Sequence, residues 1–149
     1  MRLRLSWLYQ SPSGSSLTIF DSPLPGRLLA RVRTLYSFRH DRLTTPSIAL
    51  WADRKHLVIA QYLYETRYVP GALLGLQEVL HSQLLDLLDG LNEHSEPTDW
   101  EYIGVGADDG KEGGQYNPIL YRSSIYRLIK FTNVWLSKTP SVPSKGWDA

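Results

Sequence analysis

Cysteine is absent from the 149 residues of this chain. The protein therefore forms no disulfide bond, holds no metal ion through a thiolate and uses no cysteine nucleophile. An excess of charge of one sign is also missing, because 16 lysine and arginine residues nearly balance 15 aspartate and glutamate residues and leave a net charge of +1. No global field recruits nucleic acid, so an anionic substrate would need a local basic patch and a metal ion.

Long hydrophobic runs are missing as well. The N-terminus carries Arg2 and Arg4, but its apolar stretch is too short for a secretory signal, and no later stretch is long enough to span a membrane. We therefore expect a soluble, intracellular protein. With 42% hydrophobic and 21% charged residues, the chain has the composition of a globular protein with one modest core.

The chain divides into two parts by composition. Residues 11–16 and 22–26 are clusters of serine, proline and glycine without sustained periodicity. We expect residues 1–30 to form a loosely ordered leader and residues 31–149 to form the domain. No internal repeat is present.

Periodicity predicts a fold of mixed helices and strands. Strands are expected at 29–38, 72–76, 101–105, 116–121 and 126–136, and helices at 52–64 and 82–91. The last strand is expected to return beside 116–121 across a turn at 122–124. The two helices carry apolar stripes at helical spacing, made of Trp51, Val58, Ile59, Tyr62 and Leu63 in the first and Leu84, Leu87, Leu88 and Leu91 in the second. The fold class predicted is α/β, of the α+β type.

The dipeptide Gln77-Glu78 is the strongest local signal for a site. It ends the apolar run at 72–76, directly before the leucine-periodic helix. Glu78 is therefore placed at the carboxyl edge of a sheet, where ligands collect in open α/β folds, and it is a candidate metal ligand or acid/base group. The alternative is that Glu78 only complements the positive N-terminal end of the helix dipole.

Two later stretches extend this signal. They read EYIGVGADDGKEGGQYNPILYR at 101–122 and FTNVWLSKTPSVPSKGWDA at 131–149. Together with LGLQEVL, they resemble the endonuclease/exonuclease/phosphatase superfamily, from about Arg31 to the last residue and in the expected order. The resemblance implies the deoxyribonuclease-I-like fold, a four-layered α/β sandwich, of which this chain would be the first sheet-and-helix half.

The resemblance also implies a chemistry. Members hydrolyse phosphoesters with Mg²⁺ or Mn²⁺, which is held by one or two carboxylates together with waters and substrate phosphate. Glu78 would be the metal ligand and a catalytic residue, and Lys111 in the loop 106–115 would meet a substrate phosphate. The acidic side chains of that loop have a simpler interpretation as solvated charges, which we favour for Asp108, Asp109 and Glu112.

The sequence departs from the family pattern in several places. Tyr36 or Ser37 occupies the position of a first-strand Asn that helps hold the metal or phosphate, and neither is an equivalent ligand. Gln115 stands where relatives often carry Glu. The later Gly-Asp-x-Asn and Ser-Asp-His motifs, which supply a water-orienting Asp and a catalytic His, do not occur. The chain's own histidines, His40, His56, His81 and His94, show no metal-binding spacing.

Three interpretations follow. The first is a metal-dependent phosphoester hydrolase domain represented by its N-terminal portion, the second a catalytically inactive remnant or binding module, and the third an incomplete gene model. If only the first half of the sandwich is present, the inner face of its sheet lacks a covering layer, and the isolated chain should be marginally stable or self-associate. The substrate class stays open among nucleic acid, phospholipid head group, inositol phosphate and sugar phosphate.

Overall fold

A computed structural model describes residues 5–8, 15–21, 32–37, 50–95 and 97–146. Its elements in chain order are β1 (Leu5–Leu8), β2 (Ser15–Asp21), β3 (Val32–Ser37), α1 (Trp51–Thr66), β4 (Leu73–Gln77), β5 (Val79–Leu80), α2 (His81–Glu93), β6 (Trp100–Ile103), β7 (Gln115–Tyr116), β8 (Ile119–Arg122) and β9 (Arg127–Val134). Neither α1 nor α2 is both long and apolar enough to cross a membrane. His40 and the cluster at 22–26 lie outside the described residues.

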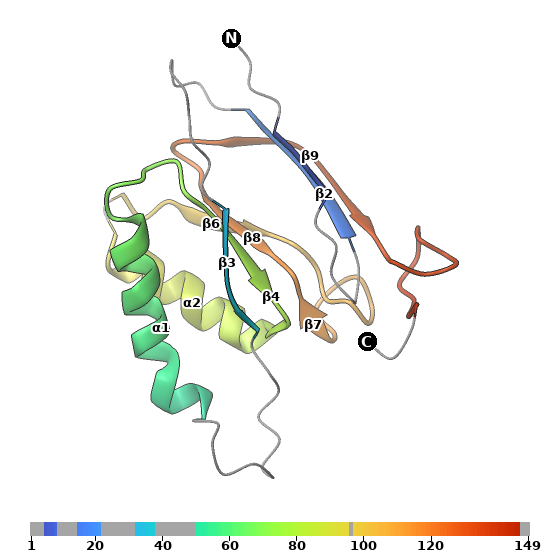
Figure 1. Ribbon diagram of the computed structural model, residues 1–149, viewed down its shortest axis with the longest axis horizontal. Helices are drawn as coiled ribbons and strands as arrows, with labels where there is room; N and C mark the ends of the chain where they lie inside the picture. Colours follow the sequence, from blue (N-terminus) through green and yellow to red (C-terminus); the bar gives the residue numbers. More distant parts are fainter. Residues whose placement is uncertain (1–4, 9–14, 22–31, 38–49, 96, 147–149) are drawn as a thin grey trace.

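The main sheet has four strands in the order β3-β4-β8-β6 (Figure 1). β3 and β4 are parallel, whereas β8 is antiparallel to both of its neighbours, β4 and β6. The architecture is mixed α/β, and the predicted helices and the strands near 29–38, 72–76, 101–105 and 116–121 are confirmed. Because β4 lies between β3 and β8, the residue that follows β4 lies at the end of an interior strand.

β9 does not join this sheet, so the prediction that 126–136 pairs with 116–121 is wrong. Both hydrogen-bonding edges of β8 are already occupied, by β4 and β6. β9 instead pairs antiparallel with β2, from Ser15 opposite Val134 to Asp21 opposite Arg127, in a sheet ordered β1-β2-β9. β1 and β2 lie within residues 1–30, and the division into leader and domain at residue 30 stays a prediction.

The first core cluster lies between the main sheet and the two helices, which cover the same face in Figure 1. It is built from the predicted stripes: Leu84, Leu87 and Leu91 of α2 are fully buried, and Val58, Ile59 and Leu63 of α1 pack against the cluster. Leu74 and Leu76 of β4 and Leu120 of β8 supply the sheet side. Burying such side chains stabilises the fold by about 1.5–3 kcal/mol each, which makes this cluster the main source of stability.

A second cluster lies on the opposite face of the sheet. It contains Leu73, Ile103, Tyr121 and Tyr126, each 2–8% exposed, with Phe131 of β9 packed against them. Figure 1 shows β2 and β9 on this side, away from the helices. The prediction that this face lacks a covering layer is therefore wrong for these residues.

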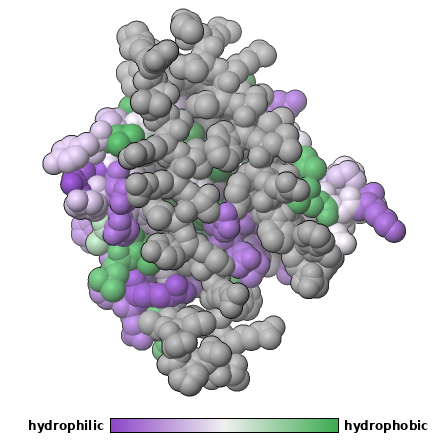
Figure 2. Space-filling model, viewed as in Figure 1, coloured by the Kyte–Doolittle hydropathy of each residue, from purple (hydrophilic) through white to green (hydrophobic). Residues whose placement is uncertain are grey.

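Self-association of the chain stays a prediction. Among the residues whose burial the structure describes, the exposed large hydrophobic side chains lie elsewhere, on α1, α2, β9 and connecting segments; they are Leu50, Leu57, Tyr64, Tyr68, Leu85, Leu128, Ile129 and Val142. On the face seen in Figure 2, the described hydrophobic residues form separate patches between hydrophilic ones. These positions do not form the inner sheet face on which the prediction was based.

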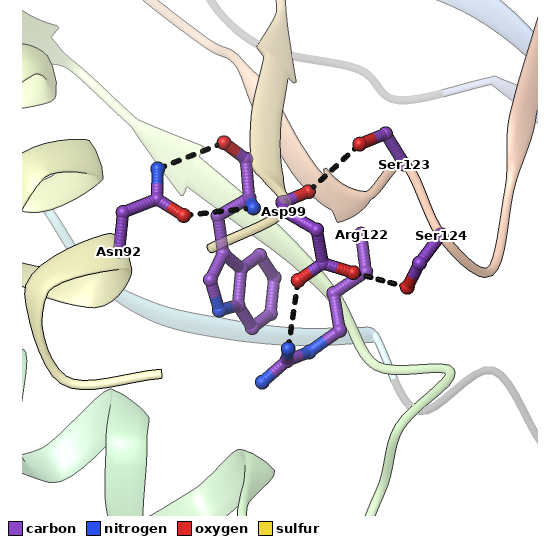
Figure 3. A network of polar contacts seen from close by, with 6 residues as sticks. Asn92, Asp99, Arg122, Ser123 and Ser124 are labelled. Carbon is purple, nitrogen blue, oxygen red and sulfur yellow. Dashed lines mark hydrogen bonds and ion pairs between the residues drawn. The ribbon is translucent and has the colours of Figure 1, made fainter. Parts of the chain in front are cut away.

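A polar network closes the edge of the sheet where β6 begins (Figure 3). Asp99 is buried and accepts hydrogen bonds from Arg122 (2.8 Å) and from the hydroxyl of Ser124. The guanidinium of Arg122 also lies over the ring of Trp100, 4.7 Å from its centroid. The side chain of Asn92 on α2 bonds both the N–H and the C=O of Trp100, at 2.9 and 3.0 Å. The network thus joins α2, β6 and the turn after β8.

Removing the Asp99 carboxylate should destabilise the protein strongly. Asp99→Ala leaves the nearly buried Arg122, whose side chain is 14% exposed, without its counter-ion. We expect a loss of about 3 kcal/mol in the free energy of unfolding, measured by urea denaturation. As a control, Lys55→Ala breaks the half-exposed pair with Asp86 and should cost less than about 1 kcal/mol. Equal losses in the free energy of unfolding for the two variants would contradict the stabilising role of the Asp99–Arg122 ion pair.

Candidate functional site

Glu78 lies immediately after β4, at the carboxyl end of a strand inside the sheet, as predicted. Its side chain is half-buried. Its backbone φ is 54°, and among the described residues it is the one residue other than glycine with a positive φ. This left-handed conformation costs roughly 1–2 kcal/mol for a residue with a side chain. Such strain is a feature of functional sites, because the surrounding structure has to hold it in place.

The strain at Glu78 arises from a β-bulge. β4 pairs with β8 with Gly75 opposite Ile119, and β5 pairs with β7 with Val79 opposite Tyr116. Three residues, 76–78, therefore face two residues, 117 and 118, across the ladder. A bulge residue in the left-handed conformation locally bends its strand and redirects its side chain. Here that residue is Glu78.

Two hydrogen bonds hold the bulge. The N–H of Leu76 donates to the carbonyl oxygen of Pro118 (3.0 Å), and the N–H of Glu78 donates to the side-chain Oδ1 of Asn117 (3.2 Å). Pro118 has no N–H of its own to leave unpaired at this irregular point. Asn117 is a residue of the site that the sequence interpretation missed. The Asn-Pro dipeptide before a strand was the signal that could have found it.

Glu78 lies before the first turn of α2, and the helix-dipole explanation stays an alternative for it. β5 separates Glu78 from α2, which begins at His81 and has no acidic residue in its first turn. The dipole effect falls off within one turn. The start of α2 is stabilised by Gln83, whose side-chain Oε1 accepts the N–H of Leu80 at 3.0 Å.

Tyr36 and Ser37, the two candidates for the position of the family's first-strand Asn, both lie on β3. Ser37, the last residue of β3, is the register partner of Gln77. Of the two candidates, Tyr36 and Ser37, it is therefore Ser37 that ends its strand directly beside the dipeptide carrying Glu78. The parallel pairing of β3 and β4 brings both carboxyl ends to one edge.

The loop 104–115 is fixed by hydrogen bonds among its own residues, both between backbone groups and to the side chain of Asp109. Oδ1 of Asp109 accepts the N–H groups of Lys111 (2.7 Å) and Gly113 (2.9 Å). These bonds hold the pKa of Asp109 below its ordinary value of 3.8. Gly106 has to be glycine, because a Cβ there would lie 2.2 Å from the carbonyl oxygen of Gly113. Asp109 thus has a structural role in the loop and is more than a solvated charge.

The loop returns to the start of α2. Nδ1 of His81 lies 3.7 Å from Oε2 of Glu112, and the ring of His81 stacks on Tyr116 with centroids 5.3 Å apart. The hydroxyl of Tyr116 donates to the carbonyl oxygen of Lys111 (2.9 Å). The side chain of Lys111 is exposed. Its backbone is therefore fixed near the strand pair β5–β7, while its role in binding phosphate stays a prediction.

The donor set at this edge suits one kind of ion. Among the described residues no three histidine, aspartate or glutamate side chains gather as a metal cage. Glu78 places one carboxylate at the strand end. Mg²⁺ keeps several waters and uses one or two carboxylates plus substrate phosphate, so the residues present fit part of a Mg²⁺ or Mn²⁺ site. They do not fit Zn²⁺, which takes four protein ligands in structural sites and three in catalytic ones.

Comparison with known proteins gives one kind of match. No protein-family model and no curated protein sequence matches the chain. Among solved structures, the mannosyl-6-phosphatase of Bacteroides thetaiotaomicron is 37% identical with a TM-score of 0.56, over 66% of this chain and 33% of its own. An endonuclease/exonuclease/phosphatase family protein of the same organism (35%, 0.54, over 66% and 33%) and one from Bacteroides vulgatus (39%, 0.54, over 66% and 34%) are similar to a comparable degree.

The class of protein follows from the fold and the identity together. The structure is a mixed α/β layer with a carboxylate at the carboxyl edge of its sheet. The chain is similar in fold to two solved proteins of the endonuclease/exonuclease/phosphatase family and shares more than a third of the aligned residues with each. The chain spans about a third of the length of these solved relatives.

The left-handed conformation of Glu78 predicts an unusual order of stabilities. Glu78→Gly should be more stable than Glu78→Ala by about 1 kcal/mol, because only glycine adopts this φ without a steric cost. The free energies of unfolding of both variants, from urea denaturation, test this. At the neighbouring Gln77 the order should reverse, since glycine is less favourable than alanine in an ordinary strand. Alanine as the more stable residue at both positions would contradict the backbone geometry.

The lowered pKa of Asp109 predicts how the loop responds to acid. A carboxylate with a lowered pKa stabilises the folded loop above its unfolded pKa, and this contribution is lost as the pH falls through the folded pKa. The amide-proton shifts of Lys111 and Gly113 in NMR spectra should therefore titrate with a midpoint below 3.8. In Asp109→Asn the same shifts should show no such titration. A midpoint above 3.8 in the wild type would show that the carboxylate does not hold the loop.

Proposed function

We propose that this chain forms the part of a metal-dependent phosphoester hydrolase that supplies the metal-ligating carboxylate, Glu78. The observation that carries the proposal is the strained conformation of Glu78 at the carboxyl end of β4. A half-buried glutamate held in a conformation that glycine would adopt at lower cost is a feature found at functional sites, where the surrounding structure maintains the strain. The similarity to family members over the aligned part supports the same assignment.

The proposed ion is Mg²⁺ or Mn²⁺. When bound, such an ion neutralises the nonbridging oxygens of a phosphoester and the negative charge that develops during displacement. Glu78 would hold the ion, and Lys111 would contribute a positive charge toward the substrate phosphate. Within the 149 residues, no Gly-Asp-x-Asn or Ser-Asp-His motif supplies an Asp and a His for activating water or protonating the leaving group.

A second candidate is a binding module without catalysis. Two departures from the family pattern favour it: Tyr36 or Ser37 takes the position of the first-strand Asn on β3, and Gln115 stands in β7, where relatives often carry Glu. Both replacements remove a stronger ligand or a charge. Such a module would keep the sheet edge and bind a phosphoester without hydrolysing it.

The two candidates share one testable property, binding of the ion by Glu78. Titration of the ¹⁵N-labelled chain with Mn²⁺ should broaden the NMR signals of Gln77, Glu78 and Val79, because the paramagnetic ion relaxes nearby nuclei. Glu78→Gln should remove this broadening. Glu101→Gln, at an exposed position on β6, is the matched control and should leave it unchanged. Broadening that survives Glu78→Gln would overturn the proposal.

A turnover assay tests whether the chain hydrolyses a phosphoester as well as binding the ion. We expect no metal-dependent hydrolysis of bis(p-nitrophenyl) phosphate, or of mannose 6-phosphate, which the name of one relative suggests. The reason is the missing acid/base pair, whose contribution is on the order of 10²–10⁴ in rate. Phosphate release with Mg²⁺ or Mn²⁺ is the measurement. Turnover that Glu78→Ala abolishes would show that the 149 residues already hold a complete site.

A further inference from the structure

We propose that Asn117 is the positioning residue for Glu78, and that its side-chain amide sets the direction in which the carboxylate faces the ion. The inference rests on the proposed function, since it concerns the same carboxylate. Asn117 is not expected to touch the ion. It acts through the backbone of Glu78, whose N–H it accepts at 3.2 Å.

The first argument is the hydrogen-bond pattern of the ladder. In a regular antiparallel pair, backbone carbonyls accept the N–H groups of the facing strand. At the bulge the strand bearing Glu78 has one residue too many, so its last N–H has no carbonyl in register. Oδ1 of Asn117 accepts this N–H in place of a backbone carbonyl. A half-buried N–H is thereby satisfied without closing the bulge.

The second argument is that the backbone of Asn117 is held in place by its neighbour Pro118. Pro118 is fully buried, and its carbonyl oxygen accepts the N–H of Leu76 at 3.0 Å. Gly104 packs so closely against it that an added Cβ would lie 2.9 Å from the Cα of Pro118. Proline restricts its own φ and also the backbone of the preceding residue. The amide of Asn117 is therefore presented from a backbone with little freedom.

The third argument is the chemistry of the side chain. An amide offers a hydrogen-bond acceptor to the backbone without adding a negative charge beside Glu78. A second carboxylate in that place would repel the first and raise the pKa of one of them. Asn117 thus fixes the direction of the carboxylate while leaving its charge to the ion. Residues that orient metal ligands in this way typically change metal affinity by 10- to 100-fold when they are removed.

Asn117→Ala tests the proposal through two readouts on the ¹⁵N-labelled chain. Hydrogen exchange of the Glu78 amide should become fast, because its acceptor is gone. The Mn²⁺ concentration at half-maximal broadening of the signals at 77–79 should rise by about tenfold or more. Asn117→Asp retains an acceptor oxygen and should keep the Glu78 amide protected. If Asn117→Ala does not fold, Asn117→Ser replaces it, since the shorter hydroxyl does not reach the same N–H.

Asn92→Ala is the matched control. Asn92 also bonds backbone groups through its amide, but at Trp100, on the edge where β6 begins. This variant should lower stability and leave both readouts at Glu78 unchanged. An equal shift of the Mn²⁺ midpoint in Asn92→Ala and Asn117→Ala would overturn the proposal, because general destabilisation would then explain it.

The remaining outcomes separate this inference from the proposed function. Fast exchange of the Glu78 amide in Asn117→Ala, with an unchanged Mn²⁺ midpoint that still depends on Glu78, overturns the positioning role and leaves the metal assignment standing. No Glu78-dependent broadening in the wild type overturns the proposed function, and the positioning role with it. Loss of amide protection together with a raised Mn²⁺ midpoint in Asn117→Ala, with the Glu78 amide still protected in Asn117→Asp, supports the inference.

Discussion

Between Gly75 and Val79, three residues of one strand face two of the other, and this mismatch governs the geometry of the candidate site. It forces one residue into a left-handed conformation, and that residue is Glu78. The hydrogen bonds from Leu76 and Glu78 to the Asn117-Pro118 pair keep the mismatch from shifting along the strands. Because side chains alternate across a sheet, a shift by one residue would move Leu74 and Leu76 out of the core.

The Asp99 network and the candidate site lie at opposite ends of the strands in the same sheet. β4 and β6 are both antiparallel to β8, so Glu78 follows the end of one strand while Asp99 precedes the start of the other. The Asp99 network joins α2 to β6 and β8 with part-buried hydrogen bonds. The end of the sheet near Glu78 has a strained residue and a loop that is held by hydrogen bonds among its own residues. The backbone strain at Glu78 is tolerated because packing and hydrogen bonds hold the rest of the sheet in place.

The similarity to solved family members concerns a part of those proteins. The chain spans about a third of their length, so the activity of a whole family member is a proposal for this chain. The departures that we expect from the family pattern, at Tyr36 or Ser37 and at Gln115, bear on the second candidate function. The β2–β9 pair covers residues of the sheet face that the family comparison led us to expect open.

The sequence by itself determined the local features of this protein. Apolar spacing of 3.6 residues defined α1 and α2, and the apolar run ending at Gln77-Glu78 placed a carboxylate at a strand end, because both signals depend on near neighbours in the chain. Tertiary structure alone decided the partner of β9, since both edges of β8 were taken. It also decided the conformation of Glu78 and the role of Asn117, 39 residues away. Register between distant strands depends on how the whole sheet packs, and no local pattern encodes it.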